Sequence, residues 1–376
     1  MPAATTGYLD YNATAPMRPA VADAMAAALG ATGNPSSVHR FGRLARQRIE
    51  EARGTVAALV GARPGQVVFT SGGTEANNLA LAGVGRPAVV SAIEHDSVLR
   101  AAPAAPRVPV HADGAIDLDA LDDLLGACAE PAVVSLMLAN NETGVIQPVA
   151  KAAALARAHG ALVHCDAVQA PGRIRVDFDA LGVDMMSLSA HKLGGPLGVG
   201  ALIVADGVIL APSLRGGGQE RQRRAGTENV AGIVGFAAAA EAAINAIADM
   251  ARLGRLRDRL EQALAALAPD LVVFGARAPR LANTSCLTMP GVAAETQVMA
   301  LDLAGVAVSA GSACSSGKVS PSHVLAAMGA GRELADQAIR VSLGWATVDA
   351  DIDLMIDAWG ALHARAGAGS KTRTAA

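Results

Sequence analysis

A lysine stands in the middle of a segment that otherwise has the composition of a protein core. Lys192 lies in "MMSLSAHKLGGPLGVGALIV", residues 185–204, between two strand-like apolar runs, and glycines let the chain bend back on itself near the lysine. Such a lysine is either a solvated turn residue or a nucleophile. A nucleophilic lysine needs a pKa lowered from about 10.4 towards roughly 7 or 8, which partial burial or a bound cation can provide.

Polar clusters follow five strand-like runs of the sequence. They are "TSGGTE", "EHDS", "NNETG", "DAVQ" and "SAHK", the last of which contains the lysine. In parallel α/β sheets, ligands bind in the loops at the carboxyl ends of the strands. Five clusters in such positions therefore predict one shared pocket.

Each cluster has a chemical interpretation and a plainer one. Gly73 and Thr74 begin a predicted helix and are suited to hold a phosphate, or they form an ordinary helix N-cap. Asp166 ends an apolar strand and either pairs with a cation, such as a protonated heterocyclic nitrogen, or caps the next turn; Gln169 could point to the same place. His95 is either a polar edge residue or a group that stacks on a flat ring and moves protons.

Cys314 lies in "VAVSAGSACSSGKVSPSH", a run of small residues without core-forming side chains nearby. This composition predicts a mobile loop on which a thiol can reach a substrate. The alternative is a surplus surface cysteine in a flexible turn.

The elements that must position these residues alternate in the order strand, then helix. "QVVFT", "AVVSAIEH", "AVVSLMLA" and "ALVHCDAV" read as strands, and most are followed by helical patterns. This order predicts an α/β fold with a mostly parallel sheet covered by helices. Near residue 250 the pattern changes to a charged helix and short strands, so we predict a large domain at 13–250 and a smaller α/β domain formed by 1–12 and 251–376.

The amino-acid composition indicates which classes of ligand and which compartment to expect. A net charge of −3, with two Trp, two Tyr and five Phe, disfavours a nucleic-acid surface and favours a small-molecule substrate. The apolar stretch "NVAGIVGFAAAAEAAINAIADM" is rich in small residues and predicts a packed helix rather than a membrane span. With no secretory signal visible and no C-x-x-C pair among four cysteines, we expect a cytoplasmic protein with reduced thiols.

Taken together, these segments resemble the cysteine desulfurases, a group of the fold-type I enzymes that use pyridoxal 5′-phosphate (class V aminotransferases). Any single motif is shared with other transaminase-like proteins, whereas the ordered set with a cysteine in the "GSAC" loop is specific. The resemblance runs nearly end to end and rests on "YLDYNATAP", "GNPSSVHRFGR", "FTSGGTEANNLAL", "EHDSVL", "NNETGVIQP", "HCDAVQAPGRI", "SLSAHKLGGPLGVGAL", "GGGQERQRRAGTENVAGIVG", "SAGSACSS" and "IRVSLGW".

The resemblance implies a role for each matching residue. Lys192 would hold the cofactor covalently, Asp166 would pair with the ring nitrogen, and His95 would stack on the ring. The remaining implied contacts are the ring oxygen (Gln169, Asn141), the phosphate (Gly73, Thr74, Ser189, His191, and Thr227 of a neighbouring subunit) and the substrate (Arg340 on its carboxylate, with Asn34 and Asn141). A phosphate contact from a neighbouring subunit implies a homodimer.

The implied reaction converts L-cysteine to L-alanine and leaves a persulfide on Cys314. Lys192 moves the α-proton, and His95 is a candidate acceptor for the thiol proton.

The long segment between Cys314 and Arg340 is typical of the branch that serves iron-sulfur or nitrogenase maturation. In that branch an iron-sulfur scaffold accepts the sulfur and the persulfidic cysteine can transiently ligate a cluster, without a permanent metal site. The alternatives are a selenocysteine lyase or transaminase on the same scaffold, and a non-catalytic sulfur carrier.

Overall fold

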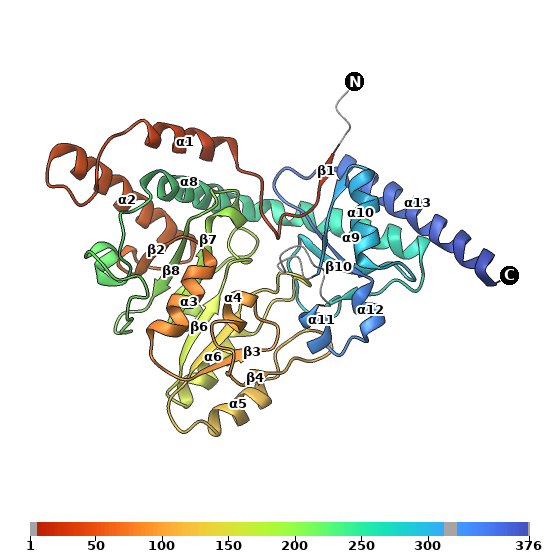
Figure 1. Ribbon diagram of the computed structural model, residues 1–376, viewed down its shortest axis with the longest axis horizontal. Helices are drawn as coiled ribbons and strands as arrows, with labels where there is room; N and C mark the ends of the chain where they lie inside the picture. Colours follow the sequence, from red (N-terminus) through yellow and green to blue (C-terminus); the bar gives the residue numbers. More distant parts are fainter. Residues whose placement is uncertain (1–5, 312–321, 375–376) are drawn as a thin grey trace.

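The computed structural model describes residues 6–311 and 322–374 (Figure 1). Cys314 lies outside the described residues. Two regions are apparent along the long axis, one containing α1–α8 and the other containing α9–α13. The segment after β1 runs between them.

A seven-stranded sheet forms the centre of the first region. Its order is β2-β8-β7-β6-β5-β3-β4, and the strands from β7 to β4 are parallel, whereas β8 is antiparallel to both β7 and β2. This confirms the predicted α/β class and the mostly parallel sheet. The bounds are β2 (Val67–Thr70), β3 (Ala88–Ser91), β4 (Arg107–Val108), β5 (Val133–Met137), β6 (Leu162–Asp166), β7 (Met185–Ser189) and β8 (Gly200–Val204).

Helices cover both faces of this sheet because its inner strands are apolar on both sides. All residues of β5, β7 and β8 are buried, as expected for strands packed between two helical layers. On α2, Ile49, Ala52 and Val56 recur at helical spacing and are buried. The helices are α1 (Pro19–Leu29), α2 (Arg40–Leu59), α3 (Gly73–Gly83), α4 (Asp96–Leu99), α5 (Leu118–Gly126), α6 (Val149–Ala158), α7 (Phe178–Leu181) and α8 (Val230–Ala246), with 3₁₀ turns η1 (Pro64–Gln66), η2 (Ala190–Leu193), η3 (Gln219–Gln222) and η4 (Ile247–Asp249).

The second region is built on a four-stranded antiparallel sheet of order β12-β13-β10-β9. Leu9 shares a core with Leu260, Ile339 and Trp359, so the N-terminal residues pack with the C-terminal part of the chain. The division at residues 12 and 250 stays a prediction. The elements are β9 (Val273–Phe274), β10 (Thr284–Thr288), β12 (Ser309–Ala310), β13 (Ala338–Ser342), α9 (Met250–Leu267), α10 (Ala294–Leu303), α11 (His323–Ala327), α12 (Arg332–Asp336) and α13 (Asp349–Thr374), with β1 (Gly7–Tyr8) parallel to β11 (Val306–Ala307).

One helical stretch, Val230–Leu267, is long and apolar enough by length and composition to cross a membrane. It consists of α8, η4 and α9 in succession. On α8, Ile233, Phe236 and Ala239 are buried in the core beside the seven-stranded sheet. This burial agrees with the prediction of a packed helix.

Candidate active site

A cavity of about 580 Å³ opens at the carboxyl ends of the parallel strands. All five predicted polar clusters contribute to it, which confirms the expectation of one shared pocket. The predicted site residues that line it are Gly73, Thr74, His95, Asn141, Asp166, Gln169, Ser189, His191, Lys192 and Arg340. The individual roles of these residues remain predictions.

Lys192 reaches this cavity from η2, at the bend between β7 and β8. The two strands pair antiparallel, as the two apolar runs around the lysine predict. Its Nζ donates hydrogen bonds to the backbone oxygens of Asn12 (2.6 Å) and Ala13 (2.8 Å). Lys192 as a whole is half-buried and lines the cavity, so it is not a solvated turn residue.

The Asp166 carboxylate lies at the end of β6, 7% exposed, and faces the same cavity. It accepts hydrogen bonds from Asn77 Nδ2 (2.8 Å) and from the backbone N–H of Val168 (3.0 Å). Both donors are neutral, so a cationic group in the cavity would complete the charge balance of this carboxylate.

The N-terminus of α3 presents backbone N–H groups to the cavity. Gly72 is its N-cap, with a φ of 155° that side chains rarely adopt, and no side chain caps the helix. A Cβ on Gly73 would lie 2.9 Å from Val168 Cγ2, so a side chain there would force Val168 to shift. Burial, and secondarily the charge of Lys192, lower the pKa of His191 to about 4, which keeps its ring neutral. This set of neutral donors is suited to an anion such as phosphate.

Arg340 brings a guanidinium into the cavity from β13. Its Nη2 bonds to Asp10 Oδ1 at 2.7 Å and its Nη1 donates to the backbone oxygen of Asn141 at 3.1 Å. Its Nε is buried without a hydrogen-bond partner among the described residues. An incoming carboxylate can therefore use a donor that the protein leaves unsatisfied.

His95 is the N-cap of α4, and its ring orientation is fixed. Nδ1 accepts a hydrogen bond from the backbone N–H of Ser97 (3.1 Å), so in the neutral ring the proton is on Nε2. The Ser97 hydroxyl lies 2.8 Å from the same Nδ1 and accepts from Asn77 Nδ2. Through Ser97 and Asn77, His95 is connected to Asp166.

Several cavity residues received no individual role from the sequence. Three of them are Asn12, Asn77 and Glu142, each of which lies inside a motif quoted above. Glu142 is 2% exposed, accepts a hydrogen bond from Ser322 Oγ (2.6 Å), and has a pKa raised to about 7 by burial. The signal that could have identified them is their position in the motifs "NATAP", "TEANN" and "NNETG", of which the last two also contain predicted site residues.

Two predicted residues lie outside this cavity. Asn34 is exposed and accepts a hydrogen bond from the backbone N–H of Ser36. Thr227 is exposed and lines a separate cavity of about 120 Å³ with Ser71 and Arg224. Within one chain, neither residue joins the site.

Thiols and metal ligands are sparse in the described part of the chain. Cys128, Cys165 and Cys286 are free, and Cys165 and Cys286 are buried. Across residues 6–311 and 322–374, no three His, Cys, Asp or Glu side chains gather in a way that could hold a metal ion.

Comparisons with known proteins agree with this arrangement. The aminotransferase class-V family model matches residues 7–355. The IscS-like cysteine desulfurase of Mycobacterium tuberculosis is 42% identical, with 96% of each chain covered. Among solved structures, the NifS-like protein of Rickettsia africae has a TM-score of 0.89 at 35% identity (94% of this chain, 98% of that one), and SspA in complex with cysteine has 0.77 at 29% (90% and 99%). The chain therefore belongs to the aminotransferase class-V family.

Proposed function

We propose that this chain is a cysteine desulfurase that depends on pyridoxal 5′-phosphate. Enzymes of the class-V family and the cysteine desulfurases use this cofactor, and the relatives at about 42% identity are named as desulfurases. The observation that carries the proposal is geometric. The Lys192 amine, the Asp166 carboxylate and the uncapped start of α3 face one cavity.

The residues present fit this cofactor. Asp166, whose hydrogen-bond donors in the described part of the chain are neutral, would hold the protonated ring nitrogen. The N–H groups at Gly73 and Thr74, with Ser189 and His191, would hold the phosphate. Lys192 would supply the amine that binds the cofactor, Gln169 and Asn141 would contact the ring oxygen, and His95 would stack on the ring. When bound, the cofactor supplies an electron sink for the α-carbanion of an amino acid.

The protein side of the reaction follows from the charges. Arg340 binds the carboxylate of L-cysteine, and Asn141 lies beside it. Lys192 removes the α-proton from a position set by the carbonyls of Asn12 and Ala13. The Cys314 thiolate attacks the substrate sulfur, an S–S bond forms as the C–S bond breaks, and the carbon skeleton takes up a proton to leave as L-alanine. His95 is the proposed acceptor for the proton of a reacting thiol; because Nε2 is protonated in the neutral ring, it would take this proton at Nδ1.

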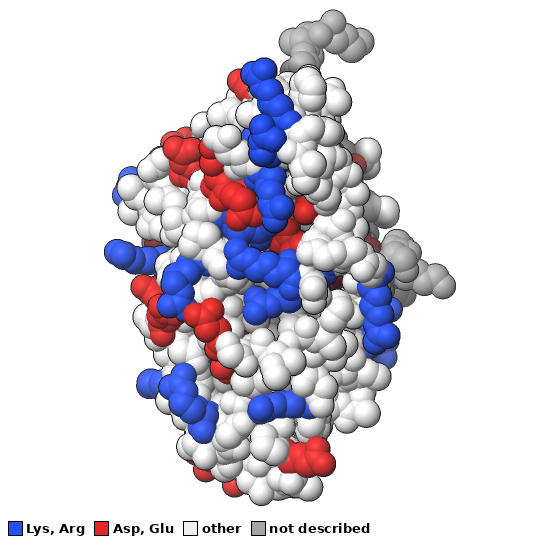
Figure 2. Space-filling model, turned by 90° about the vertical axis from the view of Figure 1, so that its left-hand side faces the viewer, with Lys and Arg blue, Asp and Glu red and all other residues white. Residues whose placement is uncertain are grey.

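A homodimer would complete the site. Thr227 is exposed outside the cavity, as a residue that serves the partner's phosphate site would be, and Asn34 is likewise exposed. Val38 (88% exposed), which precedes α2, and Phe41 (59%), on its first turn, are apolar side chains that a second subunit would cover. Figure 2 shows this end of the molecule, where Lys and Arg side chains gather in the middle of the face with Asp and Glu beside them.

The sulfur acceptor we propose is a protein of iron-sulfur cluster assembly, and the location is cytoplasmic. The support is the IscS-like and NifS-like names of the relatives. A persulfide on Cys314 could then ligate a nascent cluster transiently. Selenocysteine lysis or transamination on the same scaffold would need Lys192 and Asp166 but not Cys314.

Incubation with L-cysteine followed by mass spectrometry tests the function. We expect a yellow protein, an added sulfur of about 32 Da on residue 314, and L-alanine in solution. Lys192→Ala should lose the visible band and the alanine. Cys314→Ala should keep the visible band and lose sulfide release. Undiminished cysteine-dependent sulfide release by Cys314→Ala would refute the persulfide route.

A further inference from the structure

The guanidinium of Arg173 is buried beside the active-site cavity, on the loop that follows β6. The residue is 9% exposed, and its Nη1 donates to the backbone oxygen of Gln169 at 2.9 Å and to the side-chain Oε1 of Gln169. Its Nη2 lies 3.4 Å from the backbone oxygen of Tyr11. All of these acceptors are neutral. A buried charge without a counter-ion is costly, and an apolar side chain would fill the same space, so packing alone does not account for an arginine here.

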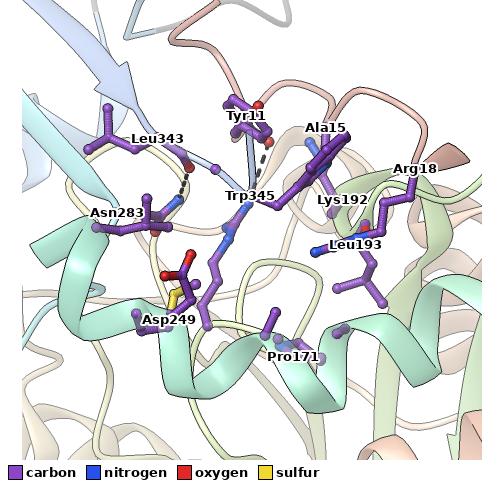
Figure 3. A pocket seen from close by; sticks show the side chains of 17 residues that line it. Tyr11, Ala15, Arg18, Pro171, Lys192, Leu193, Asp249, Asn283, Leu343 and Trp345 are labelled. Carbon is purple, nitrogen blue, oxygen red and sulfur yellow. Dashed lines mark hydrogen bonds between the residues drawn. The ribbon is translucent and has the colours of Figure 1, made fainter. Parts of the chain in front are cut away.

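The surroundings of Arg173 oppose its charge. Burial, and secondarily the guanidinium of Arg340, lower its pKa, and no acidic side chain of the described chain compensates. Arg173 lines a second cavity of about 50 Å³ that Lys192 also borders, together with the charged residues Arg18 and Asp249. Figure 3 shows Tyr11 and Trp345 on one side of this cavity and Pro171 and Asp249 on the other. Asp249 is paired with Arg252, so its charge is already balanced.

The side-chain amide of Gln169 is fixed from both ends. Its oxygen faces Arg173, which can only donate, and its Nε2 donates to the backbone oxygen of Asn12 at 3.0 Å, which can only accept. A flipped amide would place two donors face to face at one end and two oxygens face to face at the other. The same Asn12 oxygen also accepts the hydrogen bond from Lys192.

We propose that Arg173 is a positioning residue that fixes the amide of Gln169 with its NH₂ group toward the active-site cavity. Gln169 lines that cavity, so the orientation presents an N–H donor to the ring oxygen of the cofactor. The inference rests on the proposed function, which brings this oxygen to Gln169. A donor stabilises the anionic form of the ring oxygen and so lowers the pH at which the chromophore changes its protonation state.

The test is a pH titration of the visible absorption of the cofactor-loaded protein. Arg173→Met and Gln169→Leu should each raise the midpoint by about half to one pH unit, the effect of roughly one lost hydrogen bond. Arg173→Lys, which keeps a donor and the charge, should restore most of the wild-type midpoint. The affinity of the apo-protein for pyridoxal 5′-phosphate should fall about threefold to tenfold in Arg173→Met.

A double variant distinguishes a positioning role of Arg173, which acts through Gln169, from a general effect of its positive charge. In the Gln169→Leu background, Arg173→Met should move the midpoint by less than half of its effect in the wild-type background. Arg257→Met is the matched control, because Arg257 also donates to a backbone carbonyl but lies on α9, and it should leave the midpoint unchanged. An unshifted midpoint in Arg173→Met, or additive effects in the double variant, would overturn the inference.

Two further outcomes are also decisive. If Arg173→Met does not fold, Arg173→Gln replaces it, and an unshifted midpoint in that variant overturns the inference. A wild-type protein without a visible band that responds to L-cysteine would refute the proposed function instead.

Discussion

Glu142 is expected to make the stability of this protein depend on pH near neutrality. This residue is 2% exposed and lines the active-site cavity. Burial raises its pKa from 4.5 to about 7, against the opposing effects of the Ser322 hydroxyl and the charges of Arg340 and His95. The perturbation is Glu142→Gln, which keeps the shape of the side chain and an oxygen that can accept from Ser322.

The magnitude follows from linkage between proton binding and folding. Between pH 4.5 and about 7, the folded protein holds a proton on Glu142 that the unfolded chain has lost, so the free energy of unfolding falls as the pH rises. The contribution is fully present below pH 4.5 and is lost above pH 7. A pKa raised from 4.5 to about 7 corresponds to about 3 kcal/mol. Gln carries no titrating proton, so the free energy of unfolding of the variant does not fall with pH through this position.

The assay is urea unfolding of the cofactor-loaded protein at several pH values from 4.5 to 8.5. The quantity compared is the free energy of unfolding of Glu142→Gln minus that of the wild type. This difference should be roughly constant near pH 4.5 and should rise by about 3 kcal/mol, in favour of the variant, by pH 8. Taking the difference cancels other titrating groups, such as Glu94 and His164. Glu130→Gln, at an exposed position, is the control and should give a difference independent of pH. Parallel stability curves for Glu142→Gln and wild type would refute the reasoning.

Three further substitutions test the contacts around the cavity. Asn77→Ala removes the 2.8 Å donor to Asp166 and should lower the free energy of unfolding by about 1–3 kcal/mol in urea titrations; no loss would contradict the assigned contact. Arg340→Ala should raise KM for L-cysteine about tenfold to a hundredfold with a smaller effect on kcat, and an unchanged KM would exclude Arg340 from substrate binding. Gly73→Val should weaken binding of pyridoxal 5′-phosphate to the apo-protein at least about tenfold, measured by fluorescence titration, because the side chain collides with the loop after β6.

Local patterns were sufficient to predict the strands and most of the cavity. The apolar runs around Lys192 became β7 and β8, and the "GGTEANNLAL" segment became α3 with its glycine N-cap. These features are local, because strand periodicity and turn residues depend on neighbours in sequence. The rule that ligands bind at the carboxyl ends of parallel strands then placed Asp166 and His95 in one pocket.

The remaining parts of the site depend on contacts that no local pattern encodes. Asp10 pairs with Arg340 across 330 residues of sequence, and Asn12 bonds to Thr284 across 272. Nothing in the composition near Asp10 indicates its partner. Thr227 and Asn34 could not be tested for a different reason. Their predicted roles require another subunit, and a single chain does not place them in the site.

The cavity is lined by groups of both signs, which segments far apart in the sequence supply. The start of α3 is positive, Asp166 is negative, and Arg340 is positive. A ligand with a phosphate, a cationic ring and a carboxylate would have one matching group for each of them. Asp10 already balances Arg340 in part, whereas the hydrogen-bond donors to Asp166 among the described residues are all neutral. Asp166 therefore depends more than Arg340 on a ligand for its counter-charge, so Asp166→Asn should lower kcat/KM for L-cysteine more than Arg340→Ala does; an equal or smaller loss would contradict this reasoning.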